Sequence, residues 1–307
     1  MKTAIVTGAN GFIGNMLVDK LADSGVSVIA IDLPGAFAKY RRRKGVSLIE
    51  TDLTDLSSVL NNLPSEIEVL YHLAWSGVRA DLRNDYHLQL KNLDISVNVL
   101  EVASKKKVKK IIMLGSASEY IGSGEPITGH TSPCPIEAYG AAKHAAFLIC
   151  TTFAAQMGLD FIWATVTSLY GPGRDDNNIL SYAIKTLLKG EKPSFTPLEQ
   201  LWDFLYIEDF LTALYLIGIY GRAGKNYPVA SGKARPLKEY ITIVRDSINP
   251  ALPLGIGEKP YKAGKAEHSI FVIDELTKDT GFYPTYHFEE GIAKVVEYFK
   301  IKGRDVC

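Results

Sequence analysis

Short apolar runs alternate with stretches of helical periodicity along the first half of the chain. The runs are rich in Val, Ile and Leu, as buried strands are, and they lie at residues 2–6, 26–32, 47–53, 69–74, 111–114 and 161–166. Between them, apolar positions recur at helical spacing in residues 16–22, 84–107 and 135–157. This alternation predicts an α/β fold with a doubly wound parallel sheet and right-handed crossovers.

The alternation stops at a cluster of chain-breaking residues, Gly171-Pro172-Gly173. Beyond this cluster the predicted elements are shorter and mixed in type, and the earlier pattern returns only around residues 203–232. We therefore expect a larger domain made of residues 1–170 plus 203–232. A smaller, discontinuous α/β lobe made of residues 171–202 plus 233–307 would bind the substrate.

Composition narrows the class of protein. The 307 residues carry no formal net charge at pH 7, so nothing argues for nucleic acid or a membrane surface as a partner. No apolar run has membrane-spanning length, and the first strand begins at residue 2, which leaves no room for a signal peptide. Cys134, Cys150 and Cys307 show no metal-ligand spacing. We expect a cytoplasmic protein with reduced thiols and no metal.

Three glycines lie in the turn between the first strand and the first helix. Gly8, Gly11 and Gly14 have the spacing G-x-x-G-x-x-G. Gly8 permits a tight turn, Gly11 lets the backbone approach phosphates, and Gly14 lets the helix pack closely on the strand. A purely structural turn is the alternative. The strand before it and the helix after it favour a Rossmann-type site for a dinucleotide pyrophosphate.

The second strand ends on an acid, Asp32, 18 residues after Gly14. A carboxylate at this position binds the adenosine ribose hydroxyls and repels a 2′-phosphate, which favours NAD over NADP. The basic run at residues 41–44 keeps NADP open, because arginines near the ribose accept a phosphate; a solvated loop is the simpler explanation of the run. Asp52, at the end of the third strand, is placed to meet the adenine amino group.

Tyr139 and Lys143 stand four residues apart on a predicted helix, so both project from one face. A lysine ammonium near a tyrosine, together with a nicotinamide cation, favours the phenolate and lowers the pKa of the phenol, which suits acid–base chemistry. Ser116, at the end of the fifth strand, is a hydroxyl that can orient a substrate oxygen. The spacing Y-x-x-x-K is common by chance, and the glycine turn gives it weight.

Together these residues resemble the extended short-chain dehydrogenase/reductase family, and within it the nucleotide-sugar epimerases, dehydratases and ketoreductases. The matching segments span the chain: Thr7–Gly14, Asp32, Asp52-Leu53, His72-Leu73-Ala74, Asn92, Ser116, Tyr139–Lys143, Tyr170–Gly173, Asp203–Asp209 and Ser231-Gly232. The resemblance implies that Tyr139 is the acid/base for a sugar hydroxyl. It also implies that Lys143 holds the nicotinamide ribose and that Ser116 hydrogen-bonds the reacting oxygen.

The same resemblance assigns binding residues and an assembly. The expected cofactor-binding set, besides Tyr139 and Lys143, is Gly8, Asn10, Gly11, Phe12, Ile13, Gly14, Asp32, Leu33, Asp52, Leu53, Leu73, Ala74 and Asn92. The candidate substrate-binding set is Trp75, Arg79, Ser118, Ser168, Arg174, Asn178, Trp202 and Arg235. A homodimer would form through the long apolar helices at residues 84–107 and 137–157.

Departures from the family pattern bear on the reaction. Dehydratases carry an acid directly after the strand-five hydroxyl, whereas here Glu119 falls one position late if Ser116 is that hydroxyl. Aligning backwards from Gly122 puts Ala117 at the hydroxyl position, but alanine makes no hydrogen bond. Trp202 also stands where relatives commonly have arginine.

These features lead to three hypotheses. The first is an NAD(P)-dependent oxidoreductase that interconverts alcohol and ketone at C4 of a nucleotide-linked (deoxy)hexose, as a 4-ketoreductase or 4-dehydrogenase. The alternative within the class is a nucleotide-sugar 4-epimerase. The alternative of another class is a non-catalytic, dinucleotide-sensing regulatory protein.

Overall fold

Seven parallel strands form the central sheet of the computed structural model, which describes residues 1–38, 40, 42–174, 178–261 and 268–304. Their order is β10-β6-β5-β4-β1-β2-β3, and every neighbouring pair is parallel. The strands are β1 (Thr3–Thr7), β2 (Ser27–Asp32), β3 (Val46–Glu50), β4 (Val69–His72), β5 (Lys110–Ser116), β6 (Asp160–Val166) and β10 (Asn226–Val229). The predicted doubly wound parallel sheet is confirmed.

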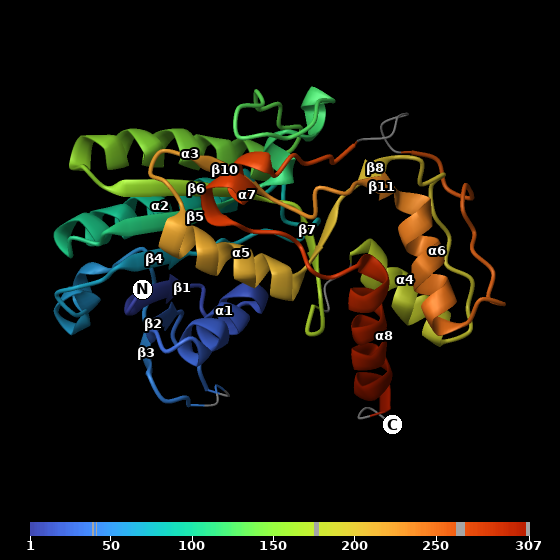
Figure 1. Cartoon of the computed structure of the whole chain (residues 1–307), viewed down its shortest axis with the longest axis horizontal. Coiled ribbons are helices and arrows are strands. Elements are labelled where there is room, and N and C mark those ends of the chain that lie inside the picture. The colour runs from blue at the N-terminus through green and yellow to red at the C-terminus, as the bar shows by residue number, and fades with distance from the viewer. Residues whose placement is uncertain (39, 41, 175–177, 262–267, 305–307) are drawn as a thin grey trace.

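Helices cover both faces of this sheet (Figure 1). On one face lie α1 (Phe12–Asp23) and α5 (Ile207–Tyr220), and on the other α2 (Tyr86–Lys105) and α3 (Ala138–Met157). Two buried apolar clusters result: Leu17 and Phe210 belong to the first, Leu100 and Ala146 to the second. Because both faces are covered, the strands are continuously apolar rather than alternating. Within the described residues, no helix is both long and apolar enough to cross a membrane.

A second group of helices stands apart from the sheet (Figure 1). It consists of α4 (Ile179–Leu188), α6 (Leu237–Ile248) and α8 (Phe288–Arg304), with α6 packed on both others. Two small sheets accompany it: β8 (Leu201–Trp202) pairs antiparallel with β11 (Arg235–Pro236), and β7 (Ser168–Tyr170) pairs parallel with β9 (Phe204–Tyr206).

One helix differs from the predicted division of the chain. Residues 233–307 were assigned to the smaller lobe, yet α7 (Asp274–Thr280) packs on α5 and β10 of the larger domain. The physical reason is burial, because Leu276 and the following Phe282 are almost fully enclosed in the core beneath α5. The third strand also ends earlier than expected, at Glu50. The chain then turns so that the Asp52 carboxylate accepts the Thr54 N–H at 2.9 Å.

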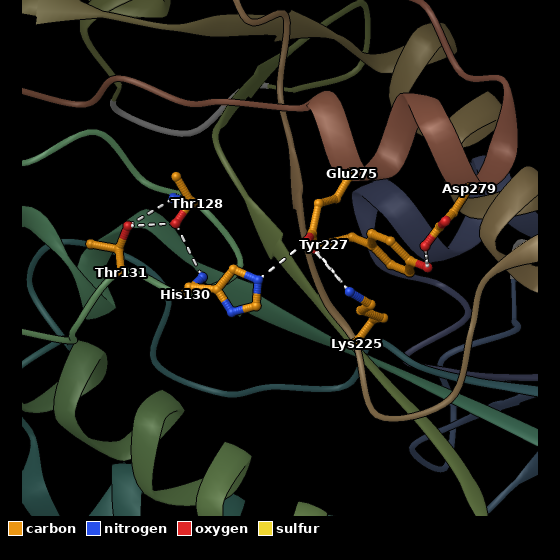
Figure 2. Close-up of polar contacts among 7 residues, drawn as sticks. All are labelled: Thr128, His130, Thr131, Lys225, Tyr227, Glu275 and Asp279. Carbon is orange, nitrogen blue, oxygen red and sulfur yellow. Dashed lines mark hydrogen bonds and ion pairs between the residues drawn. The ribbon is translucent and has the colours of Figure 1, made fainter.

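Short 3₁₀ turns and a polar clasp shape the loop between β5 and α3. The turns are η2 (Ala117–Glu119) and η3 (Ile121–Ser123); a third, η1 (Ser57–Asn62), follows β3. Figure 2 shows the clasp, in which Glu275 of α7 meets His130 of this loop at 3.2 Å and Lys225 at 3.3 Å. The clasp holds the loop that leads into the helix carrying Tyr139.

Candidate active site

The glycine turn has the geometry that its residues predict. Gly8 has φ +66°, and a Cβ there would lie 2.7 Å from the backbone nitrogen of Ala74. A Cβ on Gly14 would lie 2.0 Å from the Gly8 carbonyl oxygen, so α1 packs on the turn with no room for a side chain. Gly11 is exposed and begins α1, where no side chain of the described residues caps the helix. The first N–H groups of α1 are therefore not capped by a side chain, as phosphate binding requires.

Asp32 lies directly against this turn. Its carboxylate accepts the backbone N–H groups of Asn10 at 2.7 Å and Leu33 at 2.8 Å. The neighbouring basic run gives little support for NADP, because Arg43 forms ion pairs with both Asp19 and Asp23 of α1. Arg41 lies outside the described residues. The glycine cradle and the acid beside it fit a dinucleotide that lacks a 2′-phosphate.

The loop after β4 borders the glycine turn and is held by α2. The side-chain amide of Asn92 accepts the Ser76 N–H at 2.8 Å and donates to the Ser76 carbonyl at 3.0 Å. Trp75 donates from Nε1 to Gln89 at 2.9 Å. The amide of Asn92, a predicted cofactor residue, thus positions this loop. Gln89 is a second residue that supports the loop, and the sequence pattern did not reveal it.

His72 is a packed strand histidine, as its surroundings in the sequence indicate. Its Nδ1 hydrogen-bonds the Thr7 hydroxyl at 2.7 Å. Burial lowers the pKa of the imidazole to about 3, so the ring is neutral at physiological pH. Within the described residues no group of three or more His, Cys, Asp or Glu side chains is placed to hold a metal ion.

The predicted catalytic trio comes together where β5 ends beside the first turns of α3. Close packing makes this possible: a Cβ on Gly140 would lie 2.1 Å from the Ser118 carbonyl oxygen. The Ser116 side chain lies close enough to Tyr139 to oppose the rise that burial causes in the pKa of the phenol. The Lys143 ammonium donates to the Leu114 carbonyl at 2.8 Å.

Trp75 closes the group on the side of the β4 loop. The Lys143 ammonium lies 3.6 Å from the centre of the Trp75 ring, a cation–π contact. The same ring meets Tyr139 edge-on, with 6.3 Å between the ring centres. Trp75, a candidate substrate residue, therefore lies beside both Tyr139 and Lys143.

Burial sets the electrostatics of the pair Tyr139 and Lys143. It lowers the pKa of Lys143 to about 7. It also raises the pKa of Tyr139 above its usual value, opposed first by the Ser116 side chain and then by the Arg83 guanidinium. Among the groups of the chain, desolvation therefore outweighs the nearby cations, and the expected lowering of the phenol pKa, which includes a nicotinamide cation, stays a prediction.

Arg83 is a site residue that the sequence did not reveal. Its guanidinium carbon lies 5.3 Å from the centre of the Tyr139 ring, and it pairs with Glu137 at 3.4 Å. Its carbonyl accepts the Tyr139 N–H at 2.9 Å. No local pattern marks Arg83, since it reaches Tyr139 only through the fold.

The candidate substrate residues fall into two groups. Ser168, Trp202 and Arg235 meet, because Trp202 donates from Nε1 to the Ser168 hydroxyl at 2.9 Å and Arg235 pairs with Trp202 across β8 and β11. Arg235 also bonds Glu289 at 2.8 Å. The charge of Arg174 acts on Tyr139, which places Arg174 near the phenol.

The other candidates have their polar groups engaged locally. Arg79 is largely exposed and pairs with Asp81 at 2.6 Å. Asn178 caps α4 by accepting the Ser181 N–H at 2.9 Å. Ser118 is buried, and its N–H donates to the Ser116 hydroxyl oxygen at 3.2 Å. Asn178 and Ser118 therefore have structural roles, and Arg79 lies on the exposed surface.

Comparison with known proteins gives a consistent picture. The model of the NAD dependent epimerase/dehydratase family matches residues 4–230. The chain is 30% identical to the UDP-glucuronate 4-epimerase of Thermodesulfobacterium geofontis, over 96% of this chain and 95% of that protein.

Two solved structures show the same fold. One is the UDP-N-acetylglucosamine 4-epimerase of Methanobrevibacter ruminantium, in complex with UDP-N-acetylmuramic acid. It has a TM-score of 0.87 at 24% identity, and the superposition covers 98% of this chain and 99% of that chain. The other is the UDP-glucuronic acid 4-epimerase of Bacillus cereus, in complex with NAD. It also has a TM-score of 0.87, at 20% identity, and the superposition covers 98% of this chain and 99% of that chain. The chain belongs to the NAD dependent epimerase/dehydratase family.

Proposed function

We propose that this protein is a nucleotide-sugar 4-epimerase that retains its NAD between turnovers. The observation that carries the proposal is the group formed by Ser116, Tyr139 and Lys143, in which Tyr139 and Lys143 are buried. The Glu119 carboxylate behind this group is held inside the protein by the Ser116 N–H and the Nε1–H of Trp163. Because this carboxylate is fully buried and bound to those two N–H groups, it is not placed to donate the proton that dehydration needs. Similarity to UDP-sugar 4-epimerases supports this choice over the 4-ketoreductase or 4-dehydrogenase hypothesis.

The chain's own residues supply positioning and proton transfer. When bound, NAD supplies a hydride acceptor that returns the hydride to the same carbon. Tyr139 takes the proton of the C4 hydroxyl as the C4–H bond breaks, and gives the proton back when the keto sugar is reduced on its other face. Ser116 orients the C4 oxygen, and the positive charge of Lys143 stabilises the Tyr139 phenolate. Proton and hydride both return, so the net reaction inverts C4 alone.

The test is incubation with UDP-glucose, UDP-galactose and UDP-glucuronate. Reduced nicotinamide is followed by its absorbance, and the sugars are separated by chromatography. Conversion of one sugar to its C4 epimer without net reduction supports the proposal. Stoichiometric cofactor turnover contradicts it in favour of a dehydrogenase or ketoreductase, and no conversion of any sugar favours the dinucleotide-sensing alternative.

We propose NAD rather than NADP as the cofactor, on the strength of Asp32. Its carboxylate lies beside the turn that would hold the pyrophosphate, and a 2′-phosphate there would meet a negative charge. In a fluorescence titration of cofactor-free protein, NADH is expected to bind at least about tenfold more tightly than NADPH, since like-charge repulsion costs on the order of 1.4 kcal/mol or more. Equal affinity would remove Asp32 as the selector.

We also propose that the protein is a homodimer through α2 and α3. These helices expose large apolar side chains on the outer face of the molecule: Tyr86, Leu90, Leu148 and Ile149. An exposed apolar patch spanning two packed helices favours association. The variant Leu90→Arg is expected to sediment as a monomer at micromolar concentration where the unmodified chain sediments as a dimer. A monomeric unmodified chain would contradict the proposal.

A further inference from the structure

One buried carboxylate near the site has no part in the proton transfer described above. Glu119 ends the 3₁₀ turn η2, and its side chain is 0% exposed. Its Oε1 accepts the Ser116 N–H at 2.7 Å and the Nε1–H of Trp163 at 3.3 Å. Gly115 leaves the room for this, because a Cβ there would lie 2.6 Å from Oε1. The carboxylate thus reaches the reacting end of β5 from inside the protein.

The second oxygen of Glu119 faces His144. Its Oε2 lies 3.7 Å from His144 Nδ1, and neither atom has a hydrogen-bond partner among the described residues. The aromatic rings of Phe147 and Trp163 lie around them, so the surroundings are apolar. A buried carboxylate without a cation is costly, and His144 is the side chain that stands opposite it.

The pair adjoins the residues that carry the chemistry. His144 directly follows Lys143 on α3, and the Glu119 charge acts on both members of the proton-transfer pair. Burial lowers the pKa of Lys143, and the charge of Glu119 opposes that effect. Burial raises the pKa of Tyr139, and Glu119 adds to that effect. The other titratable groups coupled to this region are Tyr120, which feels Glu119, and Cys150, which feels Lys143.

We propose that Glu119 and His144 form a positioning pair for the active site, in which Glu119 fixes the Ser116 end of β5 and places a negative charge behind Tyr139 and Lys143. His144 faces that charge from α3, with its Nδ1 3.7 Å from Oε2. The role in turnover rests on the proposed function. The charge pair itself does not, so the two are tested by separate measurements.

The first measurement reports Lys143 without any substrate. In protein labelled with ¹³C at the lysine ε-carbon, the Lys143 signal is the one missing from the Lys143→Met variant. Glu119→Gln keeps the oxygen that accepts the Ser116 N–H but removes the charge. Its Lys143 titration midpoint is expected about 1 pH unit lower, as for the loss of a nearby opposite charge. Glu125→Gln, an exposed acid on the same loop, is the matched control and leaves the midpoint in place.

His144→Gln gives the opposite sign. Removing the side chain that faces Glu119 leaves the carboxylate charge less compensated and raises the Lys143 midpoint, and loss of packing alone does not produce opposite shifts in the two variants. Because the His144 side chain is 23% exposed, this variant folds even if Glu119→Gln does not, and it then decides the matter alone. An unchanged midpoint in Glu119→Gln, or a midpoint in His144→Gln that does not rise, overturns the pair.

The second measurement is the pH profile of kcat/KM for sugar conversion. Loss of the Glu119 charge lowers the pKa of both Tyr139 and Lys143, so the whole profile of Glu119→Gln moves to lower pH. A uniform loss of rate at unchanged pH optimum would instead indicate structural damage and contradict the electrostatic role. If the unmodified protein converts no sugar while the Lys143 midpoints move as stated, the proposed function fails and the charge pair stands.

Discussion

Replacing Tyr139 by phenylalanine is expected to lower kcat for sugar conversion by about 10²- to 10⁴-fold, the usual worth of a positioned general acid–base group. The substitution removes one oxygen and keeps the ring that packs against Trp75. The thermal midpoint and the NAD content of the purified protein should therefore stay close to those of the unmodified chain. Initial rates with the UDP-sugar that the incubation above shows to be converted, measured at saturating concentration, check this directly.

Tyr120→Phe is the matched control for this variant. Tyr120 is also buried and lies just after the turn that follows Ser116, but its hydroxyl accepts the side-chain N–H of Asn226 at 3.0 Å. Loss of that contact should cost stability on the order of 1 kcal/mol and leave kcat within about twofold. If Tyr139→Phe turned over as fast as Tyr120→Phe, Tyr139 would not be the acid/base.

Replacing Gly14 by alanine should damage both the fold and cofactor binding. The new Cβ would lie 2.0 Å from the Gly8 carbonyl oxygen and 2.8 Å from Ala9 Cα, both rigid backbone atoms. Helix α1 must shift away from β1 to relieve this overlap, at a cost of about 3 kcal/mol. The melting temperature should fall by about 6 °C or more, and isothermal titration should show NAD affinity reduced at least about tenfold.

Gly11→Ala separates the two effects. Its Cβ would meet only the Gly8 carbonyl oxygen, at 3.2 Å, in an exposed turn. Folding should be close to normal, while NAD binding weakens because the backbone no longer approaches the phosphates. Normal NAD affinity in Gly11→Ala would show that the pyrophosphate does not lie on this turn. A Gly14→Ala variant as stable as the unmodified chain would contradict the close packing of α1.

Some of the site was predictable because its geometry is local. The pair Tyr139 and Lys143 shares a helix face by the four-residue spacing alone, and Ser116 follows an apolar run that had to be a strand. Gly8 is required by its positive φ, and Gly14 by its contact with the Gly8 carbonyl within the same turn of chain. Asp32 ends the strand that pairs with β1, so it had to lie at the same edge of the sheet. In each case, the spacing of the residues along the chain and the period of the helix or strand leave few possible arrangements of the side chains.

Other features depend on residues far apart in the chain, and no local pattern records them. Arg83 lies near Tyr139 only because the β4 loop and α3 meet, and α7 joins the larger domain only because Leu276 is buried beneath α5. The choice between Ser116 and Ala117 depends likewise on the fold; Ser116 stays the prediction, and its side chain acts on the pKa of Tyr139.

The sequence by itself determined the parallel sheet, because the period of its apolar positions dictates it, and it predicted the glycine turn and the trio of Ser116, Tyr139 and Lys143 from spacing together with the family resemblance. Only the tertiary structure decided which way each side chain turns. Glu119 is a residue of the type that dehydratases use as an acid, yet its side chain is enclosed against Trp163 and His144. The pKa of Tyr139 rises where neighbouring charges alone suggested a fall. Both outcomes follow from burial, which is a property of the packed protein and not of the chain.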